Sequence, residues 1–122
     1  MSAADISVVS NFRIPSSKIE ELIALGFDKA EIFNIVAPRR TLQRRIKNDA
    51  LLNLEESDRF ERLKRISQLT DIVFGSREKA HRWLRKPNRS LEGAKPIDLL
   101  VSETGAYKVQ EVLGRIQFGM YS

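Results

Sequence analysis

Apolar residues recur every three or four positions along most of the chain, which is the spacing that places side chains on one face of an α-helix. The clearest run lies between residues 54 and 74, where the residues with this spacing are Phe60, Leu63, Ile66, Leu69 and Val73. No segment of useful length alternates apolar and polar residues with the period of two that a half-buried strand needs. The pattern therefore predicts an all-α protein with about seven helices.

Capping and stop signals predict two short helices near the N-terminus. The serines at positions 16 and 17 can cap a helix that Gly26 ends. Asp28 and Glu31 have the spacing of a capping box, so they predict the start of a second helix, which ends near Ile35. The first 15 residues lack a periodic pattern and end in Pro15, so we expect a flexible arm there.

A third short helix is predicted from Arg39 to about Asn48. Pro38 lies at its start, and the fixed φ of proline suits the first turn of a helix. Leu42 and Ile46 are four residues apart, so we expect both on the buried face.

The remaining helices follow from similar signals. The long helix begins after Asn53 and stops at Gly75, Ser76 caps the next helix, and Pro96 opens a short apolar one. Ser102 caps the last helix, which Gly119 ends. On the outer face of the long helix, acids lie four residues before bases and are expected to form ion pairs: Glu55 with Arg59, Asp58 with Arg62, and Glu61 with Arg65.

Residues 28–48 have the layout of a helix-turn-helix, whose second helix enters the major groove of DNA. The second helix is about 15 Å long. The side chains on it that suit phosphates or base edges are Arg39, Arg40, Thr41, Gln43, Arg44 and Lys47. The turn 36–38 lacks the glycine often found there. A solvated basic helix is the alternative interpretation.

The cationic residues are clustered. The chain holds 21 Lys and Arg against 16 Asp and Glu, a net charge of +5. Residues 38–47 carry five cations and no acid, and residues 77–89 carry six cations and one acid. Such clusters favour a nucleic-acid partner, because cations that contact phosphates release counterions.

Composition excludes several classes of protein. A chain of 122 residues with 42% hydrophobic residues forms one compact domain or two very small ones. There are no cysteines and one histidine, His81, so we expect no disulfide, no metal site, no cofactor and no enzymatic activity. No run approaches the roughly 20 apolar residues of a membrane span, and no signal-peptide pattern is present, so we expect a cytoplasmic protein without membrane contact.

The last three residues have an unusual composition. Met120, Tyr121 and Ser122 follow the helix stop at Gly119 and combine apolar, aromatic and carboxylate groups. A tip of this kind at the end of a helix can fill a pocket of a partner protein. The alternative is a tip that folds back on the domain.

The segment from Phe74 to Ser122 resembles the C-terminal domain of the Xre/MbcA/ParS-like antitoxins, which are partners of RES-domain toxins. The residues that carry the resemblance are Phe74-Gly75, Trp83-Leu84, Pro87-Asn88, Pro96, Leu99-Leu100, Gly105, Leu113, Arg115, Ile116, Gly119 and Tyr121. A weaker resemblance covers residues 28–71, with the Arg39–Arg45 and Glu55–Arg59 segments.

The resemblance implies a type II antitoxin that neutralises an NAD-consuming RES-domain toxin, forms a homodimer and represses its own operon. Because a dimer with two-fold symmetry docks on two adjacent half-sites, we expect an operator with an inverted repeat. The expected regions are a flexible arm (1–15), a helix-turn-helix DNA-binding region (16–53) and a helical toxin-binding and dimerisation domain (54–122). The residues expected to bind the toxin and occlude its active site are Arg115, Gly119, Met120, Tyr121 and Ser122. A helix-turn-helix regulator without a toxin partner is the alternative.

Overall fold

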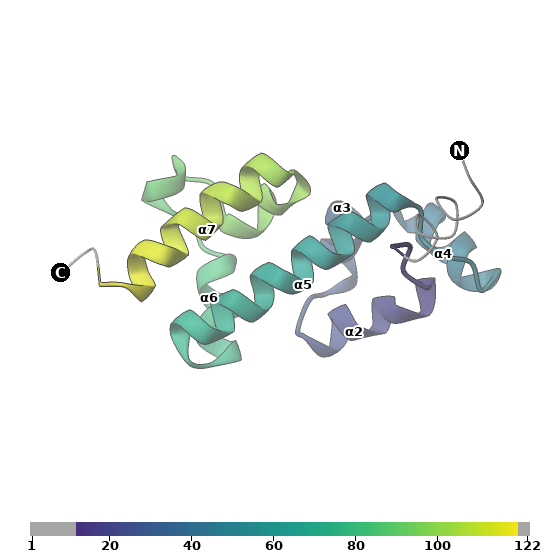
Figure 1. Cartoon of the computed structure of the whole chain (residues 1–122), viewed down its shortest axis with the longest axis horizontal. Coiled ribbons are helices and arrows are strands. Elements are labelled where there is room, and N and C mark those ends of the chain that lie inside the picture. Colours follow the sequence, from purple (N-terminus) through teal and green to yellow (C-terminus); the bar gives the residue numbers. More distant parts are fainter. Residues whose placement is uncertain (1–11, 120–122) are drawn as a thin grey trace. The chain divides into compact units, whose positions relative to one another are not determined.

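A computed structural model of the chain describes residues 12–119 (Figure 1). Within these residues every regular element is a helix, which confirms the predicted all-α class, and the sole β-bridge among them joins Pro15 to Leu51. The chain forms two compact units, the first ending at Glu61 and the second beginning at Arg62.

The α-helices are α2 (Ile19–Ala24), α3 (Lys29–Ile35), α4 (Arg39–Lys47), α5 (Leu54–Phe74), α6 (Arg77–Leu84) and α7 (Glu103–Gln117). The short 3-10 helices are η1 (Ser16–Lys18), η2 (Arg89–Leu91) and η3 (Pro96–Val101). The first unit contains η1 to α4 and the first turns of α5, and the second unit contains the rest of α5 and all later elements.

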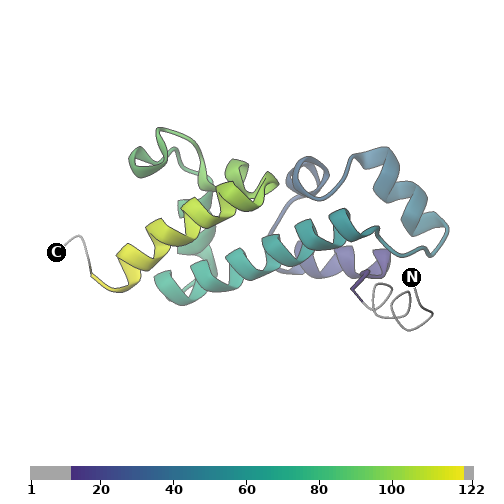
Figure 2. The ribbon, with the colours of Figure 1, turned by 45° about the horizontal axis from the view of Figure 1, so that its top comes forward.

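The first unit packs its short helices around the N-terminal end of α5 (Figure 2). Its fully buried side chains include Leu22, Phe27, Ile32, Leu42 and Leu52. The predicted capping box at the start of α3 is confirmed: the Asp28 side chain accepts a hydrogen bond from the Glu31 amide, and the Glu31 carboxylate accepts one from the Asp28 amide. Two backbone amides that the helix itself leaves unpaired are thereby satisfied.

Three local predictions in this unit were wrong. Ser16 lies inside η1 and donates a hydrogen bond from its Oγ to the Arg45 carbonyl oxygen, 3.1 Å away, so it caps no helix. Pro38 is the N-cap of α4, with extended backbone, and lies just before the first turn. Ile46 is 49% exposed, because Leu42 alone fills the buried face of α4.

The described end of the predicted arm is fixed to the first unit. The Ile14 amide donates to Ser57 Oγ and the Leu52 amide donates to the Ile14 carbonyl oxygen, at 2.9 and 2.7 Å. Arg13 Nε donates to the Leu52 carbonyl oxygen. These contacts tie residues 13–15 to the segment that leads into α5, and residues 1–11 lie outside the described part of the chain.

In the second unit α7 lies along the C-terminal part of α5 and against η3 (Figures 1 and 2). Leu100 of η3 and Leu113 of α7 are fully buried. Gly105 permits this packing, because a Cβ atom there would collide with the Leu99 carbonyl oxygen. The Ser102 side chain caps α7 as predicted, by accepting a hydrogen bond from the Gly105 amide.

Only one of the three predicted ion pairs along α5 forms. Glu55 contacts Arg59 at 3.7 Å. Arg62 and Arg65 reach Glu103 at the start of α7, at 2.9 and 3.0 Å, and not the acids four residues before them. These two arginines therefore join α5 to α7, a role that the spacing along one helix could not indicate.

Candidate functional site

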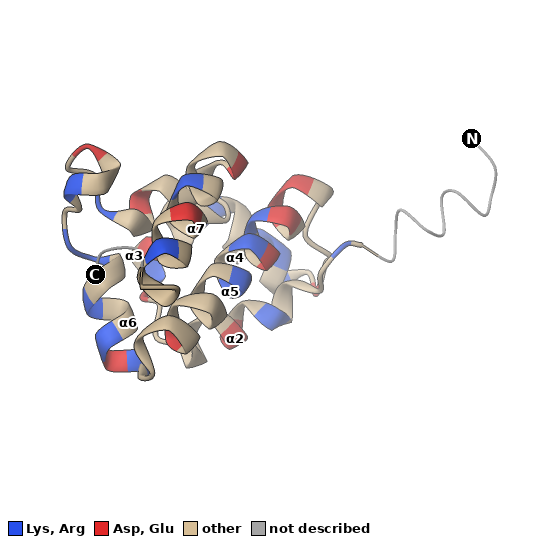
Figure 3. Cartoon of the chain, turned by 60° about the vertical axis from the view of Figure 1, so that its left-hand side comes forward, with Lys and Arg blue, Asp and Glu red and all other residues tan. Residues whose placement is uncertain are grey.

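The α4 basic surface consists of the exposed polar side chains Arg39, Arg40, Gln43, Arg44 and Lys47. These are five of the six residues predicted to contact DNA, and the sixth, Thr41, is half-buried between them. Figure 3 shows the blue Lys and Arg segments along α4. The buried Leu42 fixes the rotation of the helix and turns these cations outward.

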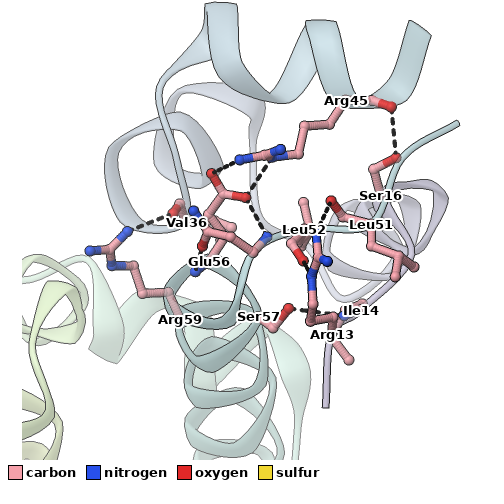
Figure 4. Close-up of polar contacts among 11 residues, drawn as sticks. Arg13, Ile14, Ser16, Val36, Arg45, Leu51, Leu52, Glu56, Ser57 and Arg59 are labelled. Atoms are coloured by element: carbon pink, nitrogen blue, oxygen red, sulfur yellow. Dashed lines mark hydrogen bonds and ion pairs between the residues drawn. The ribbon is translucent and has the colours of Figure 1, made fainter. Parts of the chain in front are cut away.

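Arg45 is the exception on α4, because its side chain points inward to Glu56 of α5 (Figure 4). Its Nε and one terminal nitrogen donate to the two Glu56 carboxylate oxygens at 2.7 and 3.2 Å. Glu56 is buried and also accepts a hydrogen bond from the Asn53 amide at 2.8 Å. Residues 38–47 hold five cations and no acid, but Arg45 pairs with an acid of another helix, so four of the five cations are exposed.

The connection between α3 and α4 is held by buried side chains and by a hydrogen bond from α5. Val36 and Ala37 are buried in the core of the first unit, and Arg59 of α5 donates to the Val36 carbonyl oxygen at 3.3 Å. The Arg39 guanidinium lies 5.4 Å from the centre of the Phe33 ring, which adds a cation–π contact between the two helices. These contacts hold the start of α4 against α3 and α5, while its cationic surface stays exposed.

Arg115 is the one predicted toxin-binding residue with a described charged side chain, and it is exposed on α7. It borders a groove of about 400 Å³ between α7 and the η2 region, together with Lys108 and Glu111 of α7 and Glu92. Gly119 follows α7 with a φ of +70°, so it ends the helix as predicted. The predicted residues Met120, Tyr121 and Ser122 lie outside the described residues.

Two aromatic residues on α7 escaped the sequence analysis. Tyr107 is 62% exposed and Phe118 is 78% exposed. They are 11 residues apart, which is close to three turns, so they lie on the same side of the helix. Both fall outside the buried stripe that contains Ala106, Val109 and Val112. This position relative to the stripe is visible in the sequence and could have indicated that both side chains are exposed.

Gly114 lies on α7 between Phe118 and the groove residue Glu111. A Cβ atom at Gly114 would have no neighbour within 4 Å. Glycine inside a helix is destabilising relative to alanine, and packing within the chain does not require it here. The side of α7 with Tyr107 and Phe118 is therefore open for close approach of another backbone.

Other parts of the resemblance have structural roles. The Phe74 and Trp83 rings pack at 5.6 Å between centroids, joining α5 to α6. The Asn88 side chain caps η2 by accepting a hydrogen bond from the Ser90 amide, and Gly75 has a φ of +73° that ends α5. These residues shape the second unit, whereas Arg115 is exposed.

His81, the one histidine of the chain, is a buried residue of α6. No group of three or more histidine, cysteine, aspartate or glutamate residues suited to a metal ion occurs in residues 12–119. In the same residues no helix combines the length and the apolar character needed to cross a membrane.

Comparison with known proteins links the second unit to a described family. Residues 69–119, which include α6, η2, η3 and α7, match the Antitoxin Xre/MbcA/ParS C-terminal toxin-binding domain. The chain is similar to proteins named Antitoxin Xre in Pseudomonas putida, at 39% identity over 84 residues, and in Yersinia enterocolitica, at 36% over 96 residues. These alignments cover 69% and 77% of this chain, and the chain spans 53% and 65% of the two relatives.

A third relative is aligned over more of its own length. The protein named Prs ADP-ribosylating antitoxin from a Sphingobium species is 31% identical over 120 residues, which cover 89% of this chain and 76% of the relative. The match to the domain and these three relatives agree with the resemblance seen in the sequence. The chain therefore belongs to the Xre/MbcA/ParS antitoxin family.

Proposed function

We propose that the chain is the antitoxin of a type II toxin–antitoxin system, and that it binds and inhibits a RES-domain toxin that consumes NAD. The observation that carries this proposal is the match of residues 69–119 to a toxin-binding domain. All of the helices after α5 belong to the matched segment. The second unit is thus the proposed toxin-binding unit.

The toxin-facing surface is proposed to lie on α7. Exposed aromatic residues are typical anchors of protein interfaces, and Tyr107 and Phe118 are exposed on one side of this helix. Arg115 can add a charged contact from the neighbouring groove. Gly119, Met120, Tyr121 and Ser122 follow the helix, and we assign them the occlusion of the toxin's active site.

The DNA-facing surface is proposed to be the α4 basic surface. Its arginines and Gln43 suit phosphates and base edges, and α3, the three-residue connection and α4 have the order of a helix-turn-helix. A homodimer would place two such helices on successive half-sites about 34–36 Å apart, so the operator would contain an inverted repeat. In this way the antitoxin would repress its own promoter.

Co-expression with the product of the adjacent gene tests the proposal. We expect the two proteins to purify as a complex, and the complex to shift promoter DNA. Changing Arg40 and Arg44 to alanine should weaken the DNA shift and leave the protein complex intact. A chain that shifts its promoter but never binds the neighbouring protein would instead be a regulator without a toxin partner, and a chain that does neither would refute both functions.

A further inference from the structure

The net positive charge of the chain comes from the residues of the second unit. Up to Glu61 the sequence holds nine Lys and Arg against ten Asp and Glu. From Arg62 onward the sequence holds twelve Lys and Arg residues against six Asp and Glu residues. The unit that contains the proposed DNA-reading helix is therefore close to neutral, whereas the proposed toxin-binding unit is strongly cationic. The proposed function leaves this charge without a role.

Half of those twelve cations lie on one stretch of the chain, α6 and the turn after it, where Figure 3 shows several blue segments. We name it the α6 basic surface, and its members are Arg77, Lys79, Arg82, Arg85, Lys86 and Arg89, all of which are exposed. The buried residues Ala80, His81 and Leu84 fix the rotation of α6. This rotation turns the cationic side of the helix to solvent.

Nearby acids neutralise only part of this charge. Glu78 accepts a hydrogen bond from Arg82 at 2.9 Å, and Asp71 lies 3.6 Å from Arg77. By sequence, residues 71–89 therefore hold a formal surplus of four positive charges, and in the described residues Lys79, Lys86 and Arg89 form no ion pair. A surplus of this size attracts a polyanion, since exposed isolated ion pairs contribute little.

The composition of the surface favours phosphate over a protein partner. Protein interfaces have apolar centres that are depleted of lysine, whereas protein–DNA interfaces are strongly positive. Between residues 77 and 90 none of the exposed side chains is a large apolar one. The large exposed apolar side chains of the second unit lie elsewhere, at Ile72, Val101, Tyr107 and Phe118.

We propose that the α6 basic surface is a second DNA-binding site, which contacts the phosphate backbone without reading the sequence. It extends the proposed function, on which it rests only in that the chain binds DNA. α4 selects the operator, and the α6 basic surface adds affinity that is equal for all sequences. Counterion release would make this contribution strongly dependent on salt.

The test uses the full chain with Lys79, Lys86 and Arg89 changed to glutamine, beside a control with Arg40 and Arg44 changed to alanine. Binding to the promoter duplex and to a scrambled duplex of equal length is measured over a range of salt concentrations. We expect the α6 variant to lose affinity for both duplexes by the same factor. The slope of log affinity against log salt should fall by about 2.7, at 0.9 for each lost phosphate contact.

The two variants separate the two proposals. An unchanged slope in the α6 variant overturns the second site even if the α4 control loses promoter preference. The reverse result, with a reduced slope in the α6 variant and no change in the α4 control, overturns the α4 assignment and supports the second site. A loss of toxin binding with unchanged DNA binding would identify the surface as a protein interface and refute the proposal. An unchanged melting temperature shows that the exposed substitutions leave the fold intact.

Discussion

Arg44 and Arg45 are neighbours in the sequence, and their side chains lie in opposite environments. Arg44 is exposed on the α4 basic surface, whereas Arg45 pairs with the buried Glu56. Removing one partner of a buried ion pair leaves an uncompensated charge, which is far more costly than removing an exposed cation. Adjacent arginines of α4 thus differ in role: Arg45 stabilises the fold, whereas Arg44 is exposed and is proposed to contact DNA.

We predict that Arg45→Ala lowers the free energy of unfolding by about 3 kcal/mol, because Glu56 stays buried without its partner. Arg44→Ala is the matched control and should change it by less than about 0.5 kcal/mol. Urea denaturation of both variants provides the measurement. Equal stability of the two variants would contradict the inward role of Arg45.

Gly114 provides a second test at the residue scale. We predict that Gly114→Ala raises the free energy of unfolding by about 0.5–1 kcal/mol, because it removes the cost of a helical glycine. The added methyl group points into open space, where we place the toxin, so the same change should weaken toxin binding by about tenfold. Chemical denaturation and titration of the toxin measure the two effects. A stabilised variant with full toxin affinity would show that the partner does not approach this side of α7.

At the scale of elements, the sequence predicted where helices begin and end, but it did not predict which side chains make contacts between helices. The capping box of α3, the length of α5 and the serine caps of α6 and α7 depend on neighbouring residues, so local spacing predicts them. The exposure of Ile46 and the pairing of Arg62 with Glu103 depend on which distant element packs nearby. Local spacing holds no information of that kind.

The contact between α5 and α7 predicts a pH effect. The hydrogen bond from Arg62 is the main cause that holds the pKa of Glu103 below its ordinary value of 4.5, with Arg65 helping and desolvation opposing. A carboxylate with a lowered pKa in the folded state stabilises the fold above its unfolded pKa, and this contribution is lost as the pH falls through the folded value.

We therefore predict that Glu103→Gln lowers the free energy of unfolding by about 1 kcal/mol at pH 7, a modest value because the Glu103 side chain is largely exposed. The gap between the variant and the parent chain should close as the pH falls from 4.5, the ordinary pKa of the carboxyl group, through the lower pKa that Glu103 has in the folded chain. Denaturation curves recorded from pH 7 to pH 3 test this. A gap that stays constant over that range would exclude a role for the charge of Glu103.

At the scale of the whole molecule, the chain combines a unit with a cationic helix and a unit that matches a toxin-binding domain. The sequence predicted the α4 basic surface, because clustered charge and helical spacing are both visible without a structure. The exposure of Tyr107 and Phe118 was missed, although both residues fall outside the apolar stripe of α7, because an aromatic residue in a helix usually belongs to the core. The proposed plug of Met120, Tyr121 and Ser122 stays a prediction.

The central claim is that the second unit inhibits an NAD-consuming toxin, and the most direct measurement is the rate of NAD loss caused by the RES-domain toxin that we propose as its partner. The chain at an equimolar ratio is expected to abolish that loss. The double change Tyr107→Ser and Phe118→Ser is expected to restore much of it, whereas Ile72→Ser, which alters an exposed apolar residue of α5, should not. Undiminished NAD loss in the presence of the unaltered, folded chain would contradict the account.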